Sequence, residues 1–305
     1  MFTRPNSNDP APIVADYIEL QCLLTQTPVS SYTLRSLFSM SDDEIDNNGV
    51  ESSDDRSVFA IEDGIKECEQ RAASCPAKYP FTVNENSLEP QADEGVYREI
   101  YQFLLLSTRL NMNEQKVQAG HDATKLFEEL CASVAGEYFG QHSKSFVFGT
   151  AGSGTFQEKI EHVIRSLHLV SAYKTPLGST GRQKDAAVDV IAWIPFADNK
   201  DSQMIAIGQC KTGTHWESML TSMQPKTFFG AYFTGEPFAD VERMFFVTES
   251  YGMDKWEERS RKAGIMFDRT RIMEYAPDNI DGMLLRKITE WNQAAMASVQ
   301  KDFEI

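Results

Sequence analysis

Two runs of apolar residues separated by a short polar segment form the clearest pattern in the chain. Residues 187–194 (Ala-Val-Asp-Val-Ile-Ala-Trp-Ile) and 204–211 (Met-Ile-Ala-Ile-Gly-Gln-Cys-Lys) are apolar almost throughout, as are strands that are covered on both faces. The segment between them contains Asp, Asn, Lys and Ser, which are typical of a solvated turn. The pattern predicts a β-hairpin buried in a sheet.

Helical spacing of apolar residues dominates the N-terminal half. It predicts helices over residues 13–24, 32–40, 58–73, 96–110 and 123–138. The last of these follows Asp122, whose side chain is a good N-cap. Residues 47–55 and 75–91 are rich in turn-forming residues and are predicted to be linkers.

Helices and strands alternate in the C-terminal half. A helix with Phe156, Ile160, Val163 and Leu167 on one face precedes the hairpin. After the hairpin, the pattern predicts a strand over 243–250, a helix over 254–262, a helix C-cap at Gly264, a strand from 265 and a helix over 280–299. The predicted fold class is α/β, with a central mixed sheet flanked by helices. We expect a mainly helical region at residues 1–145, for recognition, regulation or partner docking, and an α/β domain at residues 146–305.

The predicted hairpin carries three polar side chains. Asp189 lies within the first strand, and Gln209 and Lys211 end the second, on the same face because strand side chains alternate. A buried carboxylate is costly unless it is paired or binds a metal. Asp189 and the Gln209 amide oxygen would hold Mg²⁺ or Mn²⁺, and Lys211 would orient or deprotonate a water or neutralise charge on a phosphate. The structural alternative has Asp189 capping the hairpin and Lys211 extending into solvent from a strand end.

The order Asp, hairpin, Gln-x-Lys resembles the core of the PD-(D/E)XK, restriction-endonuclease-like nucleases, most closely the Mrr-like branch, in which Gln replaces the second acid. The resemblance covers about residues 150–277 and implies that fold for residues 146–305. It also implies a helix glutamate in the metal site. Ile160-Glu161 is similar in position to the family's Phe-Glu pair, so Glu161 is the first choice and Glu158 the second, with ordinary solvated helix acids as the alternative. Where the family has Gly-Asp-Gly-Gly before its metal aspartate, this chain has Lys-Asp-Ala-Ala at 184–187.

The resemblance implies a metal-dependent DNA endonuclease that hydrolyses phosphodiester bonds in prokaryotic restriction or anti-phage defence. Its catalytic set would be Asp189, Gln209, Lys211 and Glu161. The residues expected to contact nucleic acid are Arg182, Lys184, Thr212 and Thr214. The alternatives are a repair nuclease or junction resolvase of the same superfamily, a catalytically silent nuclease-fold subunit of a larger DNA-processing complex, and a purely structural helical protein. The last would leave Asp189 and Lys211 far apart.

The net charge of -16 is concentrated near the N-terminus. Residues 1–100 contain 19 acidic and 7 basic residues, whereas residues 151–305 contain 21 and 18. A nearly neutral nuclease region implies modest affinity for DNA, so we expect a homodimer or a complex with an ATPase or helicase partner. The preferred interpretation of the acidic segment 42–69 is a solvated loop, and the alternative is a docking or autoinhibitory segment.

Other sequence features limit the possibilities. The five cysteines are odd in number and show no Cys-x-x-Cys, which indicates neither a zinc site nor a disulfide framework. The glycine-rich stretch 148–155 lacks a Walker A ending and is predicted to be a hinge, with helix-start amides that could contact a DNA phosphate. Residues 1–12 lack the apolar core of a signal peptide, and no apolar run approaches the ~20 residues of a spanning helix. We therefore expect a cytoplasmic protein without membrane contact.

Overall fold

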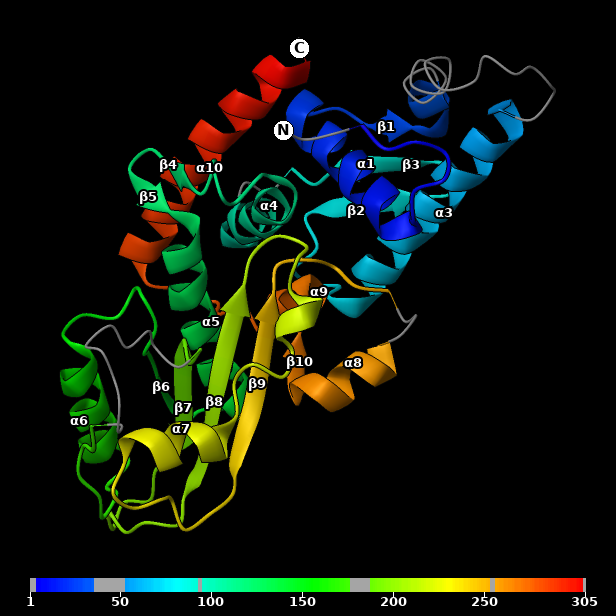
Figure 1. Ribbon diagram of the computed structural model, residues 1–305. Helices are drawn as coiled ribbons and strands as arrows, with labels where there is room; N and C mark the ends of the chain where they lie inside the picture. Colours follow the sequence, from blue (N-terminus) through cyan, green and yellow to red (C-terminus); the bar gives the residue numbers. More distant parts are fainter. Residues whose placement is uncertain (1–3, 36–52, 93–94, 176–186, 253–255, 304–305) are drawn as a thin grey trace.

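The computed structural model describes residues 4–35, 53–92, 95–175, 187–252 and 256–303. Its centre is a five-stranded sheet with the order β10-β9-β8-β7-β6 (Figure 1). The strands are β6 (Lys144–Val147), β7 (Val190–Ile194), β8 (Met204–Lys211), β9 (Val241–Val247) and β10 (Ile265–Phe267). Pairs β6–β7 and β7–β8 are antiparallel, whereas β8–β9 and β9–β10 are parallel. The predicted mixed sheet and its central hairpin are thus confirmed.

Helices cover both faces of this sheet. α5 (Ala123–Phe139) lies behind β7 and β8 in Figure 1, and α7 (Pro225–Tyr232) lies in front, with α6 (Phe156–Ser166) beside β6. Val190, Ala192 and Cys210 belong to the apolar core on the α5 side, whereas Ile191 and Ile207 belong to the core with α6 and α7. Burial of alternate residues on opposite faces explains why both strands are apolar throughout. α8 (Trp256–Ala263) packs against β9 and β10.

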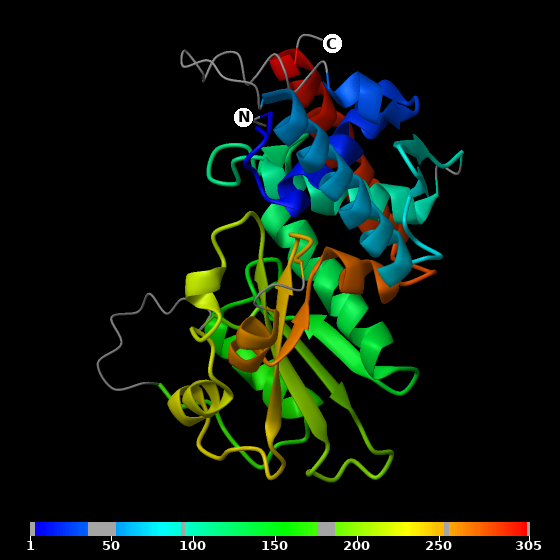
Figure 2. The ribbon, with the colours of Figure 1, turned by 90° about the vertical axis from the view of Figure 1, so that its right-hand side faces the viewer.

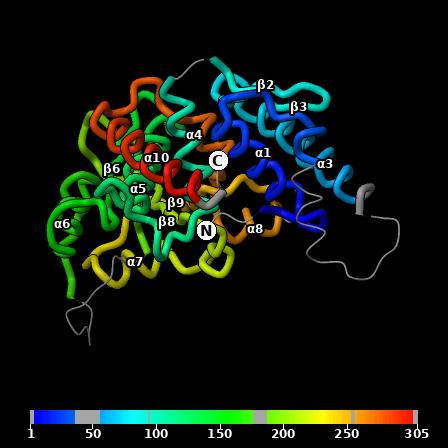
Figure 3. Tube along the Cα trace, turned by 90° about the horizontal axis from the view of Figure 1, so that it is seen from above, coloured from blue at the N-terminus to red at the C-terminus, as the bar shows by residue number. Residues whose placement is uncertain are grey.

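A second layer of helices lies beyond one end of the sheet (Figure 2). It contains α1 (Ala11–Thr25), α3 (Ser53–Ser74), α4 (Val96–Arg109), α9 (Arg269–Glu274) and α10 (Gly282–Phe303). Seen from above in Figure 3, α1 runs beside α3 and α10 beside α4. A small sheet of β1 (Val29–Ser30), β3 (Ser87–Pro90) and β2 (Phe81–Asn84) packs on α1 and α3, and β4 (Val117–Gln118) pairs with β5 (His121–Asp122).

Most of the predicted elements are present, and the errors involve short segments. The helices predicted over 13–24, 58–73, 96–110, 123–138 and 280–299 are confirmed; residues 31–35 are helical, and the rest of the helix predicted over 32–40 lies outside the described residues. The linker predicted over 75–91 is wrong, because Phe81 and Leu88 bury their side chains on a β-hairpin there. Strand β6 was not predicted. The solvated loop proposed for 42–69 is wrong from residue 53 onward, where the chain forms α3, and its earlier part lies outside the described residues.

A buried cluster of charged side chains joins the helices of the second layer. Asp16 on α1 binds Arg71 of α3 (Oδ1–Nη1 2.7 Å), Arg109 of α4 (Oδ2–Nε 2.5 Å) and Arg269 of α9 (Oδ1–Nη1 2.7 Å). Burial alone would raise the pKa of the Asp16 carboxyl, but the three arginines outweigh it and hold that pKa far below its ordinary value. Arg269 also donates from Nε to the Thr248 carbonyl just after β9, 3.0 Å away. The cluster therefore connects the helices to the central sheet.

No helix within the described ranges is both long and apolar enough to cross a lipid bilayer.

Replacing Asp16 with alanine should lower the free energy of unfolding by about 3–5 kcal/mol, because the substitution leaves buried arginine charges without their carboxylate. Urea unfolding followed by tryptophan fluorescence measures the change. The matched control is Asp63→Ala, which removes an exposed partner of Lys66 and should cost no more than about 1 kcal/mol. Equal costs for the two variants would contradict a structural role for the Asp16 cluster.

Candidate active site

The backbone and side chain of Asp189 are both fixed at the start of β7. Its amide donates to the Gly208 carbonyl (2.8 Å), and its carbonyl accepts from the amides of Phe148 (2.8 Å) and Gly149 (2.9 Å). The carboxylate is only 7% exposed and accepts a 2.7 Å hydrogen bond from the Cys210 amide. Cys210 stands between Gln209 and Lys211, so Asp189 lies beside the Gln-x-Lys motif. A purely helical protein is thereby excluded, although this cap is also what the structural alternative predicts.

Gln209 and Lys211 lie at the C-terminal end of β8. The Gln209 side chain is 2% exposed, and its Oε1 accepts a 2.8 Å hydrogen bond from Ser222 Oγ. Lys211 is half-buried opposite Val247 of β9. Cys210 belongs to the core on the α5 side, so by alternation Gln209 and Lys211 point to the other face, as predicted.

A second carboxylate, which was not predicted to be in the site, lies close to the carboxylate of Asp189. Glu128, on α5, is 5% exposed. A methyl group on Gly149 would lie 2.6 Å from Glu128 Oε2 and 2.9 Å from Asp189 Oδ1. The two oxygens are therefore no more than about 5.5 Å apart, the sum of these distances. The absence of a side chain on Gly149 allows two buried carboxylates to converge.

The glycine-rich stretch that follows β6 binds Glu128. Thr150 Oγ1 donates to Glu128 Oε1 (2.8 Å), and the Ala151 amide donates to Oε2 (2.7 Å). At the start of α6, Thr155 and Glu158 form a reciprocal capping box. Of the amides considered for contact with a DNA phosphate, those of Ala151 and Thr155 are bound to carboxylates of the protein.

The two glutamates predicted on α6 have other partners. Glu158 caps its helix, and hydrogen bonds from Thr155 lower the pKa of its carboxyl. Glu161 is half-buried and accepts a 2.8 Å hydrogen bond from Gln157 Nε2. Its role in a metal site stays a prediction, but the glutamate that meets Asp189 at Gly149 is Glu128. The sequence did contain a signal, because Phe127-Glu128 is a literal Phe-Glu pair.

Two cysteine thiols lie close to the converging carboxylates. Burial raises the pKa of Cys131 and of Cys210, and the nearby charges of Asp189 and Glu128 raise both further. These shifts keep both thiols protonated, so neither is a good nucleophile. Cys210 is a buried packing residue.

The oxygen donors suit a hard divalent cation. Within the described ranges, no group of three or more His, Cys, Asp and Glu side chains is placed to hold a metal by itself. The donors at Gly149 are two carboxylates, whereas the Gln209 amide oxygen, a predicted ligand, is on the face of β8 that points away from α5. Mg²⁺ is bound by few carboxylates and keeps several waters, so this set fits Mg²⁺ or Mn²⁺ better than zinc.

The residues predicted to contact nucleic acid are only partly described. Arg182 and Lys184 lie outside the described residues. Thr212 is half-buried and Thr214 exposed in the turn that follows β8. Between them, the Gly213 amide donates to the Ser107 carbonyl of α4 at 3.0 Å, which anchors this turn to the helical layer.

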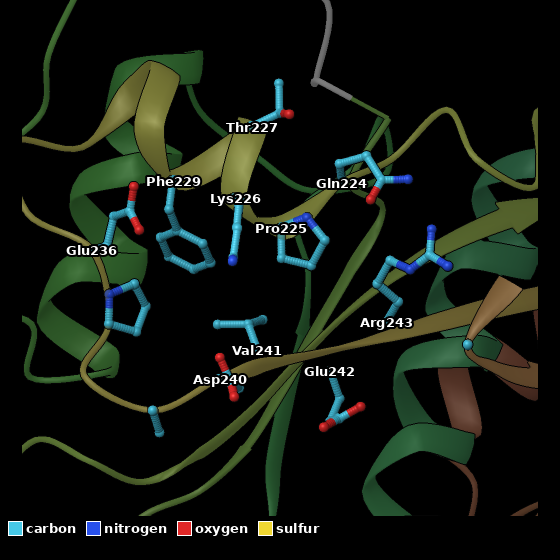
Figure 4. A pocket seen from close by; sticks show the side chains of 13 residues that line it. Gln224, Pro225, Lys226, Thr227, Phe229, Glu236, Asp240, Val241, Glu242 and Arg243 are labelled. Carbon is cyan, nitrogen blue, oxygen red and sulfur yellow. The ribbon is translucent and has the colours of Figure 1, made fainter. Parts of the chain in front are cut away.

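A cavity of about 460 Å³ lies elsewhere, between α7 and the start of β9 (Figure 4). Its lining includes Lys226, Glu236, Asp240 and Glu242, charges of both signs. Register places it at the opposite end of the β8–β9 pair from Lys211, because Val241 pairs with Ile205. It contains none of the predicted site residues.

Comparison of the chain with protein-family models, curated proteins and solved structures gives no significant match.

The backbone just before Asp189 has an unusual conformation. Ala187 has φ = 60°, in the left-handed region, where a residue with a side chain pays a steric cost. This is the last position of the run that is Gly-Asp-Gly-Gly in the nuclease family. Ala187 therefore has a backbone conformation that suits glycine better than alanine.

Changing Ala187 to glycine should leave the free energy of unfolding within about 1 kcal/mol of wild type, because relief of the left-handed cost offsets the added entropy of the unfolded chain. Changing Ala192, inside β7, to glycine should lower the free energy of unfolding by about 0.5–1 kcal/mol or more. This change adds entropy to the unfolded chain and removes a buried methyl group, and it relieves no left-handed conformation. Urea denaturation compares the two variants. A larger loss at Ala187 than at Ala192 would show that its conformation carries no strain.

Proposed function

We propose that the protein is a metal-dependent DNA endonuclease of the restriction-endonuclease-like type. The observation that carries the proposal is the convergence of Glu128 and Asp189 over Gly149, beside the Gln209-Cys210-Lys211 run. Two buried carboxylates this close favour a bound cation or a shared proton between them. The structural alternative, in which Asp189 only caps the hairpin, accounts for the bond to the Cys210 amide but not for a second acid facing the same glycine.

The order of elements also supports the proposal. Helix α5 is followed by β6, α6, β7 and β8, and then by α7, β9, α8 and β10; β6, β7 and β8 are antiparallel neighbours in the sheet. The acids come from α5 and from the start of β7, and the lysine from the end of β8. This order agrees with a helix that supplies a glutamate and a hairpin that supplies Asp and Gln-x-Lys, as the nuclease resemblance implies.

In this proposal, Asp189 and Glu128 would hold the divalent ion, which would place positive charge beside the scissile phosphate and make a neighbouring water more acidic. The Gln209 side chain points away from α5 and accepts a hydrogen bond from Ser222, so it is not counted among these ligands. Lys211 stands at the end of β8, one residue after Cys210, whose amide binds Asp189. Its ammonium orients the attacking water or neutralises charge that develops on the phosphoryl oxygens. Thr212 and Thr214, in the turn after Lys211, offer hydroxyl groups to the nucleic-acid backbone.

Asp189→Asn and Glu128→Gln should abolish tight Mn²⁺ binding and lower plasmid cleavage by a factor of about 10²–10⁴, whereas Lys211→Ala should lose cleavage but keep Mn²⁺ binding. Calorimetric titration with MnCl₂ measures binding, and conversion of supercoiled plasmid to nicked or linear DNA measures cleavage. Lys211→Ala thus separates the lysine's chemical role from the metal site.

Glu161→Gln is the matched control for Glu128→Gln, since it makes the same chemical change on the neighbouring helix. We expect it to bind Mn²⁺ and cleave like wild type. Loss of metal binding in Glu161→Gln but not in Glu128→Gln would restore the first sequence-based choice. Wild-type protein that binds no Mn²⁺ would instead favour a catalytically silent nuclease fold.

A further inference from the structure

The loop between β6 and α6 contacts both acids of the proposed metal site. The amides of Phe148 and Gly149 donate to the carbonyl of Asp189, and Thr150 and Ala151 donate to the two carboxylate oxygens of Glu128. Four successive residues therefore fix one acid through its backbone and the other through its side chain.

The loop is itself held in a tight turn. A methyl group on Gly152 would lie 2.5 Å from the Val147 carbonyl oxygen, so only glycine fits where the chain folds back. The Gly152 amide donates to the Gly149 carbonyl (3.2 Å), and Lys159 Nζ of α6 donates to the same oxygen (2.5 Å). Hydrogen bonds from the turn and from α6 thus fix the positions of Thr150 and Ala151.

A glutamate that binds a cation must have its carboxylate in one orientation. A free side chain of this length samples many rotamers, and ordering them opposes binding. Each carboxylate oxygen has more than one lone-pair direction, so an oxygen that accepts a hydrogen bond can also ligate a cation. Outer-shell donors of this kind orient metal ligands in other proteins, and their loss weakens metal affinity.

We propose that Thr150 is a positioning residue for metal binding: its hydroxyl, with the Ala151 amide, orients Glu128 toward the site shared with Asp189. This inference rests on the proposed nuclease function. Thr150 is exposed whereas Glu128 is buried, so a change at Thr150 removes a hydrogen bond without opening the core.

The test compares Thr150→Val, which keeps the shape and removes the hydroxyl, with Thr150→Ser, which keeps the hydroxyl. Calorimetric titration of the full chain with MnCl₂ should show a Kd raised by about 10–100-fold in Thr150→Val and close to wild type in Thr150→Ser. The midpoint of thermal unfolding without Mn²⁺ should be alike in the three proteins. Thr150→Ala provides a second variant without the hydroxyl.

A positioning role also predicts a distinct kinetic result. The Mn²⁺ concentration for half-maximal cleavage should rise in Thr150→Val, while the rate at saturating Mn²⁺ stays near that of wild type. Equal Mn²⁺ affinity in wild type and Thr150→Val would overturn the role of Thr150 and leave the proposed metal site intact. Failure of the wild-type protein to bind Mn²⁺ would overturn both proposals, so the two failures are distinguishable.

Discussion

The arrangement of the helices depends on the ion pairs that the buried carboxylate of Asp16 makes with three arginines. Its arginine partners come from α3, α4 and α9, and all these charges leave water together, which is favourable only when they are paired. The four helices therefore have one strongly preferred mutual arrangement. Arg269 extends this constraint to the end of β9, and the Ser107 carbonyl of α4 holds Gly213 two residues after Lys211. The helical layer thus fixes the end of the sheet where the candidate active site lies.

The elements buried on both faces were the easiest to predict. Strand β8 begins and ends at the predicted residues, and β10 begins at the predicted residue, because a run of apolar side chains between polar turns allows few other interpretations. Asp189, Gln209 and Lys211 were conspicuous for the same reason, since each is a polar residue in an apolar strand. Helices with a clear apolar stripe, such as α5, were predicted to within a residue or two.

What the sequence could not reveal depended on tertiary contacts. The Phe127-Glu128 pair was a signal in the sequence, but the burial of Glu128 follows only from the way β6 and the glycine-rich loop bring it to Asp189. The nearest helix to the hairpin in sequence was α6, which led to Glu161. Strands β1, β2, β3 and β6 have between two and four residues, too few for alternation to stand out from a turn.

Helix α10 packs on α4 although some 170 residues of sequence lie between them. The Trp291 ring meets the Phe103 ring edge to face with centroids 5.3 Å apart, and Asn292 donates to the Glu99 carbonyl. During synthesis, α4 therefore leaves the ribosome with an apolar surface that stays uncovered until residues 282–303 have been made. The packing of α4 is thus completed only after α10 has been made, and in that interval the apolar face of α4 is open to aggregation.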